Sequence, residues 1–509
     1  MKVSLRPYQE QGVAEVRLQY MQGRKSVLFV LPTGGGKTVC FCYIAEQAAR
    51  KGNRICILVH RDELVDQTSR SLGDIGVRHG VIAANRSMDL SCAVQVASVW
   101  TLARRLHRIP PDFFQLIIVD EAHHAVAGSW AKVVEHYSAA RVLGVTATPE
   151  RLDGKGLIDH FDDLVIGPDT AWLTANGFLA PAKVYAPPGA LDTSKLRSRM
   201  GDFRMDDAER QLQEGGIMGD AVTHYQRHIF PGTAIAFCCS VAHAEAVAEA
   251  FVAQGIRARS IDGTMDKAER RRLIQALGTG KVQVLTSCMI ISEGTDVPSV
   301  TGAILLRPTQ SLSLYLQMVG RCLRPAPGKR HAIINDHVGN SLRHGLPTDP
   351  REWSLKGRAK KAKDAAAPVK VCPGCFAAIP SAARECPECG HEFEAEKREF
   401  TTIEGDLVER TFKPGDMVQW LKGGQWSSGW IVRRVIDDRI LLAPAFDPRA
   451  QGTNWVDPTS LRYPLKKERA NAQSLEDLRR LAAQRGYKSG WAEHVWRSRQ
   501  QRHGSRPQP

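Results

Sequence analysis

The chain has 509 residues, 43% of them hydrophobic and 24% charged, a balance typical of globular proteins that excludes a disordered chain. At roughly 150 residues per domain, we expect three or four domains. A net charge of +15 favours a polyanionic partner such as nucleic acid, with a merely solubilising surface as the alternative.

Short apolar segments alternate with helical patterns along the first two-thirds of the chain. Strands are expected at 26–31, 55–60, 94–97, 115–120 and 141–145, with helices at 37–51 and 62–73. The pattern restarts near residue 180, with strands at 233–239, 257–261, 282–286 and 301–306 and helices at 241–254, 266–277 and 311–322. Alternating strands and helices predict parallel sheets, so the fold class is α/β with domains at 1–170 and 171–345.

The composition changes in the last third. Residues 346–370 are basic and Ala-rich, which predicts a linker. Trp- and Val-rich segments between Gly turns at 405–465 predict a small SH3-like β-barrel that binds DNA, binds protein or only packs. Residues 470–509 predict a short, basic, helical C-terminus. The chain contains no apolar run of about 18 residues that would span a membrane, and its start lacks a hydrophobic signal core, so we expect a cytoplasmic protein.

A glycine-rich segment follows the first strand and begins the first of these helices, which predicts a phosphate-binding loop for ATP. Its residues are Thr33, Gly34, Gly35, Gly36, Lys37 and Thr38, and Leu31 stands where a strict P-loop has glycine. Glycines let backbone N–H groups approach phosphates closely. We expect Lys37 on the β- and γ-phosphates and the Thr38 hydroxyl on Mg²⁺. A generic glycine-rich turn is the alternative, which the strand and helix context disfavours.

Another apolar strand ends in Asp120-Glu121-Ala122-His123. Asp120 is expected to hold Mg²⁺, and Glu121 to polarise the attacking water as general base. His123 is expected either to couple ATP chemistry to the rest of the core or only to cap the structure.

Four segments together resemble superfamily 2 helicases of the DEAD/DEAH-box type. They are Arg6-Pro7-Tyr8-Gln9, Asp120-Glu121-Ala122-His123, Thr146-Ala147-Thr148-Pro149 and Gln317-Met318-Val319-Gly320-Arg321-Cys322-Leu323-Arg324. The resemblance implies two RecA-like domains that share one ATP site. It places Gln9 on the adenine and Gln317 among the catalytic residues.

Physical reasoning supports the last of these segments independently. A phosphoryl-transfer transition state spreads charge that an arginine finger stabilises, by about 10³–10⁵ in rate. Arg321 and Arg324 lie three apart on the helix expected at 311–322, so we expect them to share a helix face. Since they belong to the second domain, the site would be complete only when the domains close.

The same resemblance implies a sequence-independent nucleic-acid track. Small hydroxyl residues, backbone N–H groups and one arginine suit phosphate contacts. Arg61 is the first candidate, with a helix-flanking surface charge as its alternative. The other candidates are Ser98, Ser240, Gly294 and Thr295, while Asp296 is expected to reach the nucleotide.

Two Cys-x-x-Cys pairs within residues 371–395 predict a zinc ribbon. The four expected ligands are Cys372, Cys375, Cys386 and Cys389. Four thiolates suit tetrahedral, structural Zn²⁺. A redox role is disfavoured because no thioredoxin-like pattern surrounds the pairs.

The order of modules resembles RadD-type bacterial DNA-repair proteins, including a Gly-Tyr-Lys-x-Gly-Trp segment at 486–491. That kinship implies DNA repair or recombination on single-stranded or branched DNA, with single-strand-binding protein or a recombinase as a partner. Two alternatives stay open. One is the motor subunit of a restriction system, although residues 345–509 contain no clear nuclease constellation. The other is a DNA-binding module that ATP only switches.

Overall fold

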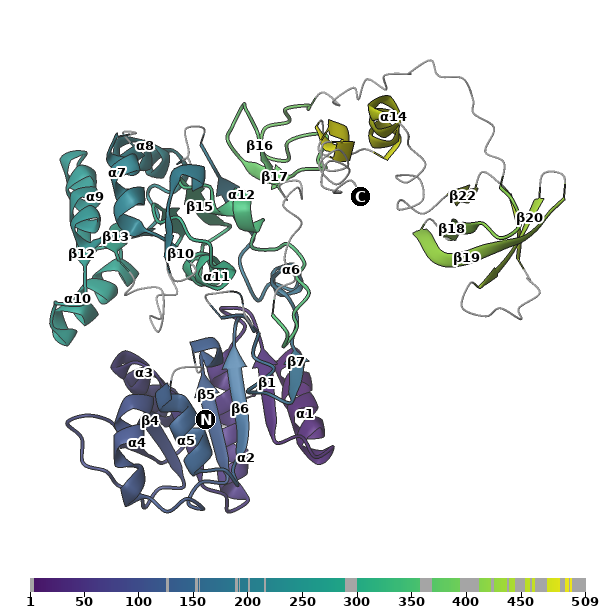
Figure 1. The fold of residues 1–509 in the computed structure, drawn as a ribbon. Coiled ribbons are helices and arrows are strands. Elements are labelled where there is room, and N and C mark those ends of the chain that lie inside the picture. The colour runs from purple at the N-terminus through teal and green to yellow at the C-terminus, as the bar shows by residue number, and fades with distance from the viewer. Residues whose placement is uncertain are drawn as a thin grey trace, which may run out of the picture. The chain divides into compact units, whose positions relative to one another are not determined.

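The computed structural model describes most of the chain in two compact units, Met1–Glu396 and Lys397–Pro509, which we treat separately (Figure 1). The described residues of the first unit are 4–124, 128–151, 154, 156–187, 191, 193–199, 202–214, 217–288, 300–357 and 369–393. Those of the second are 412–422, 425–436, 439–444, 454–457, 460–462, 474–485, 490–493 and 495–496. The candidates Gly294, Thr295 and Asp296 lie outside these ranges.

The first lobe of unit 1 is built on a seven-stranded parallel sheet with the order β3-β4-β2-β5-β6-β1-β7. Its strands are β1 (Ser26–Val30), β2 (Ile55–Val59), β3 (His79–Ile82), β4 (Val94–Ser98), β5 (Leu116–Asp120), β6 (Arg141–Thr146) and β7 (Asp163–Ile166). Its helices are α1 (Pro7–Met21), α2 (Lys37–Arg50), α3 (Asp62–Asp74), α4 (Val99–Arg105) and α5 (Gly128–His136), with 3-10 turns at Leu106–Arg108 and Ala122–His124.

The second lobe carries a six-stranded parallel sheet with the order β12-β13-β11-β14-β15-β8. Its strands are β8 (Ala182–Tyr185), β11 (Ala234–Phe237), β12 (Ala258–Ile261), β13 (Val284–Ser287), β14 (Gly302–Leu305) and β15 (Ala332–Asp336). Its helices are α7 (Met205–Glu214), α8 (Ile217–His228), α9 (Val241–Ala253), α10 (Lys267–Gly278), α11 (Leu312–Gly320) and α12 (Asn340–His344), while α6 (Thr170–Ala175) lies in the connection between the lobes. A 3-10 turn at Thr193–Lys195 and the hairpin of β9 (Ser198–Arg199) and β10 (Asp202–Phe203) complete the lobe.

Strands that are apolar throughout explain why both sheets are covered on both faces. In β2, Ile55 and Ile57 pack into one hydrophobic cluster, while the intervening Cys56 and the following Leu58 pack into another. Side chains of a strand alternate between faces, so such a run is stable only between two helical layers. The expected α/β class with two parallel-sheet, RecA-like lobes is confirmed.

Helix α11 is shorter than the sequence suggested. It ends at Gly320, whereas the pattern favoured 311–322. Arg321 occupies the position that follows the helix, and Arg324 lies in the bend beyond it. Arg324 precedes Pro325, and a proline disfavours helical backbone in the residue before it. The expectation that both arginines share a helix face is therefore wrong.

The segment that leaves the second lobe returns to the first. The carbonyl of Leu355 accepts hydrogen bonds from the backbone N–H groups of Leu157 (2.7 Å) and Ile158 (3.0 Å). A Cβ on Gly156 would lie 2.0 Å from the same carbonyl oxygen, so this close approach requires glycine. Trp353 packs against both hydrophobic clusters. We call residues 346–357 the strap; they form the first part of the segment interpreted as a linker.

A small antiparallel module follows the strap. Strands β16 (Val369–Val371) and β17 (Ala378–Pro380) pair, and the four cysteines lie around them. The module is attached to the edge strand β8, because Ala186 N donates to Phe376 O at 2.8 Å and Lys183 pairs with Glu388 at 2.5 Å. It is thus part of the second lobe's surface.

Unit 2 contains a five-stranded antiparallel sheet with the order β21-β20-β19-β18-β22. Its elements are β18 (Met417–Lys422), β19 (Gln425–Ile436), β20 (Arg439–Pro444), β21 (Asn454–Val456), β22 (Leu461–Arg462) and the helix α14 (Leu475–Arg485). The antiparallel β module is confirmed, and the SH3-like barrel stays a prediction. Among the described residues of the chain, no helix combines the length and apolar character that crossing a membrane requires.

Candidate active site

The N-terminal end of α1 packs directly on the glycine-rich loop. Tyr8 donates its hydroxyl hydrogen to Gly35 O (2.9 Å), and Gln9 donates from Nε2 to the same oxygen (3.1 Å). Gly36 has φ +88°, and a Cβ there would lie 2.3 Å from Gln9 Nε2. Only glycine combines this left-handed backbone with so close a neighbour. The structure thus brings Gln9 against the phosphate-binding loop.

Charged groups from both lobes converge on Lys37, the first residue of α2. Burial lowers the pKa of Lys37 below its ordinary value, while Glu121 and Asp120 raise it, and Arg321 and Arg324 lower it further. The Nζ atom donates to Leu31 O at 3.3 Å. Cationic side chains that face two carboxylates provide the environment that a triphosphate with Mg²⁺ requires, so these residues fit ATP and its metal.

The Asp-Glu pair lies at the carboxyl end of β5, where ligands of parallel sheets bind. Glu121 N donates to Asp120 Oδ1 at 3.0 Å. Glu121 has φ +49°, a conformation that costs a non-glycine residue about 1–2 kcal/mol and is typical of functional sites. Its Oε2 atom is buried, accepts no hydrogen bond from the described residues, and lies 3.4 Å from His123 Nδ1. A buried acceptor of this kind suits a bound water.

A buried relay joins the two lobes through His123. Thr146 Oγ1 donates to Thr148 O (2.8 Å), so it must accept the hydrogen of His123 Nδ1 (2.9 Å). In the neutral imidazole Nε2 is then an acceptor, and Gln317 Nε2 donates to it at 3.2 Å. Thr148 Oγ1 makes a second contact between the lobes by donating to Ser313 Oγ at 2.7 Å. The network therefore fixes both the tautomer of His123 and the approach of α11.

The end of α11 touches the glycine-rich loop itself. A Cβ on Gly320 would lie 2.6 Å from the Thr33 Cβ, so glycine permits the helix end to reach the loop. A Cβ on Gly34 would lie 3.7 Å from Arg324 Cγ, which locates the Arg324 stem over the loop. Arg321 is 9% exposed, and burial lowers the pKa of Arg324. Thr38 lies in the first turn of α2 and is half-buried.

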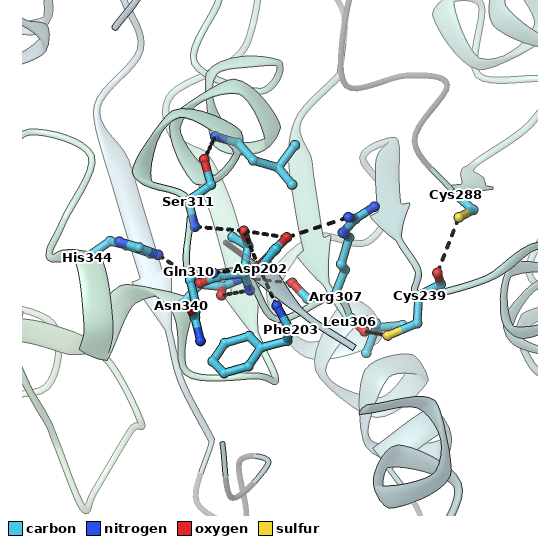
Figure 2. A network of polar contacts seen from close by, with 12 residues as sticks. Asp202, Phe203, Cys239, Cys288, Leu306, Arg307, Gln310, Ser311, Asn340 and His344 are labelled. Carbon is cyan, nitrogen blue, oxygen red and sulfur yellow. Dashed lines mark hydrogen bonds and ion pairs between the residues drawn. The ribbon is translucent and has the colours of Figure 1, made fainter. Parts of the chain in front are cut away.

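A second polar network, which the sequence did not indicate, holds the start of α11 (Figure 2). Asp202 in β10 accepts from Gln310 N (2.7 Å) and from Thr309 Oγ1 (3.1 Å), and lies 3.7 Å from Arg307. Asn340 Oδ1 accepts from Thr309 N at 2.9 Å. These bonds anchor the segment that leads into α11 and therefore the position of Gln317 within it.

The described candidates for the nucleic-acid track lie at or just beyond the carboxyl ends of three different strands. Arg61 directly precedes α3, Ser98 ends β4, and Ser240 precedes α9. Ser98 is buried, and the Ser240 hydroxyl already accepts from His243 N at 3.0 Å as a helix cap. Arg61 is partly exposed.

Beside Arg61, acidic residues of α3 pair with basic residues of α10 in the other lobe. The pairs are Asp62–Lys267 at 3.2 Å, Glu63–Arg270 at 2.8 Å and Asp66–Arg271 at 2.7 Å. Each exposed pair stabilises by about 0–1 kcal/mol. The lobes thus meet both at the relay and along these helices.

The four cysteines lie close together, as their spacing suggested. All four Sγ atoms lie within 4.8 Å of one another, and the Cys372–Cys389 and Cys375–Cys386 pairs are each 3.6 Å apart. A tetrahedral Zn–S length of about 2.3 Å gives sulfur separations of about 3.8 Å, so the cluster fits zinc. Burial raises the pKa of Cys372, but hydrogen bonds from the backbone N–H groups of Cys375 and Gly374 lower it to about 7, whereas burial raises the pKa of Cys375 to about 12.

Comparisons with known proteins agree with this geometry. The family model of the type III restriction enzyme res subunit matches residues 2–151, and that of the helicase conserved C-terminal domain matches residues 220–326. A "51.5 kDa protein" of a Lactococcus phage is 37% identical over 380 residues, 74% of this chain and 80% of that protein.

Two further relatives are informative. The "Putative ATP-dependent helicase IRC3" of Saccharomyces cerevisiae is 32% identical over 66% of this chain, which spans only 52% of the yeast protein. The solved fragment of "a putative HsdR subunit of a type I restriction enzyme" from Vibrio vulnificus shares the fold, with a TM-score of 0.53, 22% identity, and coverage of 67% of this chain and 66% of that one. The chain belongs to superfamily 2 of the helicases, in the DEAD/DEAH-box group of ATP-dependent motors.

Proposed function

We propose that the protein is a nucleic-acid-stimulated ATPase that moves along DNA or remodels it. The observation that carries this proposal is the buried His123–Gln317 contact at 3.2 Å, which connects the Asp-Glu-Ala-His segment of one lobe to α11 of the other. Chemistry at Glu121 and the relative position of the lobes are then linked through two residues. Such a link is what a motor needs to convert hydrolysis into motion.

Within this proposal, each group at the loop has a role. Lys37 binds the β- and γ-phosphates, Thr38 and Asp120 hold Mg²⁺, and Glu121 takes a proton from the attacking water. The metal, when bound, neutralises charge on the phosphate oxygens. Gln9 contributes to adenine selection, and its hydrogen bond to Gly35 O of the phosphate-binding loop supports this role.

The arginines complete the site from the second lobe. Arg321 and Arg324 stabilise the charge that develops on the transferred phosphoryl group. Their electrostatic influence on Lys37 supports this role, because it requires both guanidinium groups to be near the loop. Gln317 acts beside them by holding His123.

DNA is the proposed partner, bound without regard to sequence. The +15 net charge favours a polyanion, and Arg61 lies at the carboxyl edge of the first sheet. Ser98, Ser240, Gly294 and Thr295 are further proposed contacts, and Asp296 a proposed contact to the nucleotide. Because backbone phosphates carry no base code, single-stranded and branched DNA would both serve.

We also propose the domain organisation read from the sequence. Domains at 1–170 and 171–345 are followed by a linker at 346–370, a zinc module at 371–395, an SH3-like domain at 405–465 and a basic tail at 470–509. Cys372, Cys375, Cys386 and Cys389 hold structural Zn²⁺. A cytoplasmic RadD-type role in repair or recombination, with single-strand-binding protein or a recombinase as partner, belongs to the same proposal.

The motor subunit of a restriction system is the second candidate. The match of residues 2–151 to the res-subunit family and the fold shared with an HsdR fragment favour it. A module that ATP merely switches is the third alternative, and it predicts binding without turnover.

The test is ATP turnover measured with no nucleic acid, single-stranded DNA, branched DNA and RNA side by side. Glu121→Gln should bind ATP but lose turnover, because an amide keeps the shape of the carboxylate and cannot accept the proton. The matched control is Glu135→Gln, an exposed residue of α5. Wild-type turnover by Glu121→Gln would contradict the general-base role, and absence of turnover in the wild type with every nucleic acid would contradict the proposed function.

A further inference from the structure

One partly buried lysine binds the turn that carries the two arginines. Lys329 lies between α11 and β15, and its Nζ atom donates to Val300 O (2.6 Å), to Arg324 O (2.8 Å) and to Cys322 O. An ammonium group has three hydrogens, so these bonds use its whole donor capacity. Among the described residues, no carboxylate pairs with it.

The Lys329 ammonium group is hydrogen-bonded to carbonyl oxygens and not to a carboxylate, and this choice of partners needs an explanation. Burial lowers the pKa of Lys329, and the neighbouring Arg324 lowers it further, so this position disfavours a second cation. A charge in such a position is stable only when its hydrogens have hydrogen-bond acceptors. Two of its partners, Cys322 O and Arg324 O, are backbone oxygens in the turn that follows the end of α11.

These oxygens have no helical partner, because α11 ends at Gly320. Ala180 N donates to Leu323 O at 2.7 Å, while Lys329 binds the carbonyls on either side, of Cys322 and Arg324. Three consecutive carbonyl groups are thus held. The backbone that directs the Arg321 and Arg324 side chains therefore has a fixed path although it is no longer helical.

The third bond ties this turn to the sheet. Val300 is buried and directly precedes Thr301, whose N–H group donates to Thr233 O at 2.9 Å beside the start of β11. Lys329 therefore connects the arginine turn to the entry of β14 near the centre of the second sheet.

We infer that Lys329 is a positioning residue for ATP hydrolysis, whose ammonium group holds the 321–324 turn so that both arginine side chains reach the phosphate-binding loop. This inference rests on the proposed ATPase function. Lys329 does not touch the nucleotide in this role; it acts through Arg321 and Arg324. A displacement of about 1 Å at such groups costs on the order of 10²-fold in rate.

The test compares steady-state ATPase kinetics and thermal stability of three full-length variants with the wild type. Lys329→Met keeps most of the length of the side chain and removes all three hydrogen-bond donors. Lys329→Arg keeps the charge and the donors. The matched control is Arg257→Met, because Arg257 also binds backbone oxygens of the second lobe, those of Gly280 and Lys281 (both 3.0 Å), away from α11.

We expect Lys329→Met to lower kcat at saturating DNA by about 10- to 100-fold while the KM for ATP changes less than about threefold. Lys329→Arg should recover most of the lost rate, and Arg257→Met should keep wild-type kcat. In an Arg321→Ala/Arg324→Ala background, Lys329→Met should have little further effect, since no arginine remains to be positioned. If Lys329→Met does not fold, Lys329→Gln, whose amide still donates two hydrogen bonds, takes its place in every comparison.

A fall in melting temperature with unchanged kcat would overturn the inference, because Lys329 would then only stabilise the fold. So would a full additional loss of rate in the background without arginines. If the wild type hydrolyses ATP and the Lys329 variants match it, the positioning role alone is wrong. If the wild type shows no turnover, the proposed function fails first, and this inference fails with it.

Discussion

The single hydrogen bond between Gln317 and His123 allows the coupling between the lobes to be measured. Both residues are buried, with Gln317 and His123 each 3% exposed. Gln317→Leu would remove one hydrogen-bond donor from the buried ring of His123, and the loss of a buried hydrogen-bond partner costs about 1–3 kcal/mol. Since about 1.4 kcal/mol corresponds to a factor of ten, the closed arrangement would become about 5- to 140-fold less populated.

A double-mutant cycle isolates this interaction from other effects of the substitutions. Gln317→Leu and His123→Phe are each expected to reduce kcat/KM for ATP by that factor at saturating DNA. The double variant should lose less than the product, because replacing both polar partners by apolar groups leaves neither unpaired. The assay is ATP turnover converted to activation free energies.

The matched control is Gln283→Leu. Gln283 is also a buried glutamine of the second lobe, but its Oε1 accepts from Arg257 N (3.2 Å) at the amino end of β13. Gln283→Leu should lower the stability of the protein without changing the coupling between Gln317 and His123. Strictly additive losses in the cycle, with an interaction energy below about 0.5 kcal/mol, would refute the reasoning.

Two further predictions concern the loop and the cysteines. Lys37→Ala should weaken both ATP binding and turnover, because it removes the cation at the phosphates; unchanged rates would mean that the phosphate loop has been assigned to the wrong residues. Cys386→Ser should release about one zinc per chain and expose residues 371–395 to protease, because structural zinc supplies folding free energy to so short a module. Basal turnover should largely survive, and metal analysis that finds no zinc in wild-type protein purified without chelator would exclude the site.

The features that the sequence predicted best are those that depend on residues close together along the chain. The run Ile55–Val59 and the glycines before Lys37 each carry a local signal, because an apolar strand or a left-handed glycine is specified by the residue itself. The two parallel sheets and the phosphate loop follow from such signals. Edge strands such as β7 and β8 were missed, because their residues are only partly buried and break the apolar run.

Contacts between the lobes could not be predicted in the same way. Gln317 and His123 are 194 residues apart, so no periodicity relates them. The sequence pattern predicts the C-terminal end of α11 too late, because apolar residues continue to Leu323. Pro325 is the signal that ends the helix earlier. Lys329 had no signal at all, since a lysine after a glycine normally indicates an exposed turn.

The strap has a mechanical consequence. The lobes are joined once through α6 and again where Leu355 O binds Leu157 N and Ile158 N, so two separate attachments restrain them. Two bodies fixed at two points can turn about the line through those points, but they cannot translate apart without breaking one attachment. Separation of the two lobes should therefore be a rotation about one preferred axis. ATP hydrolysis would then drive one lobe to rotate against the other about that axis.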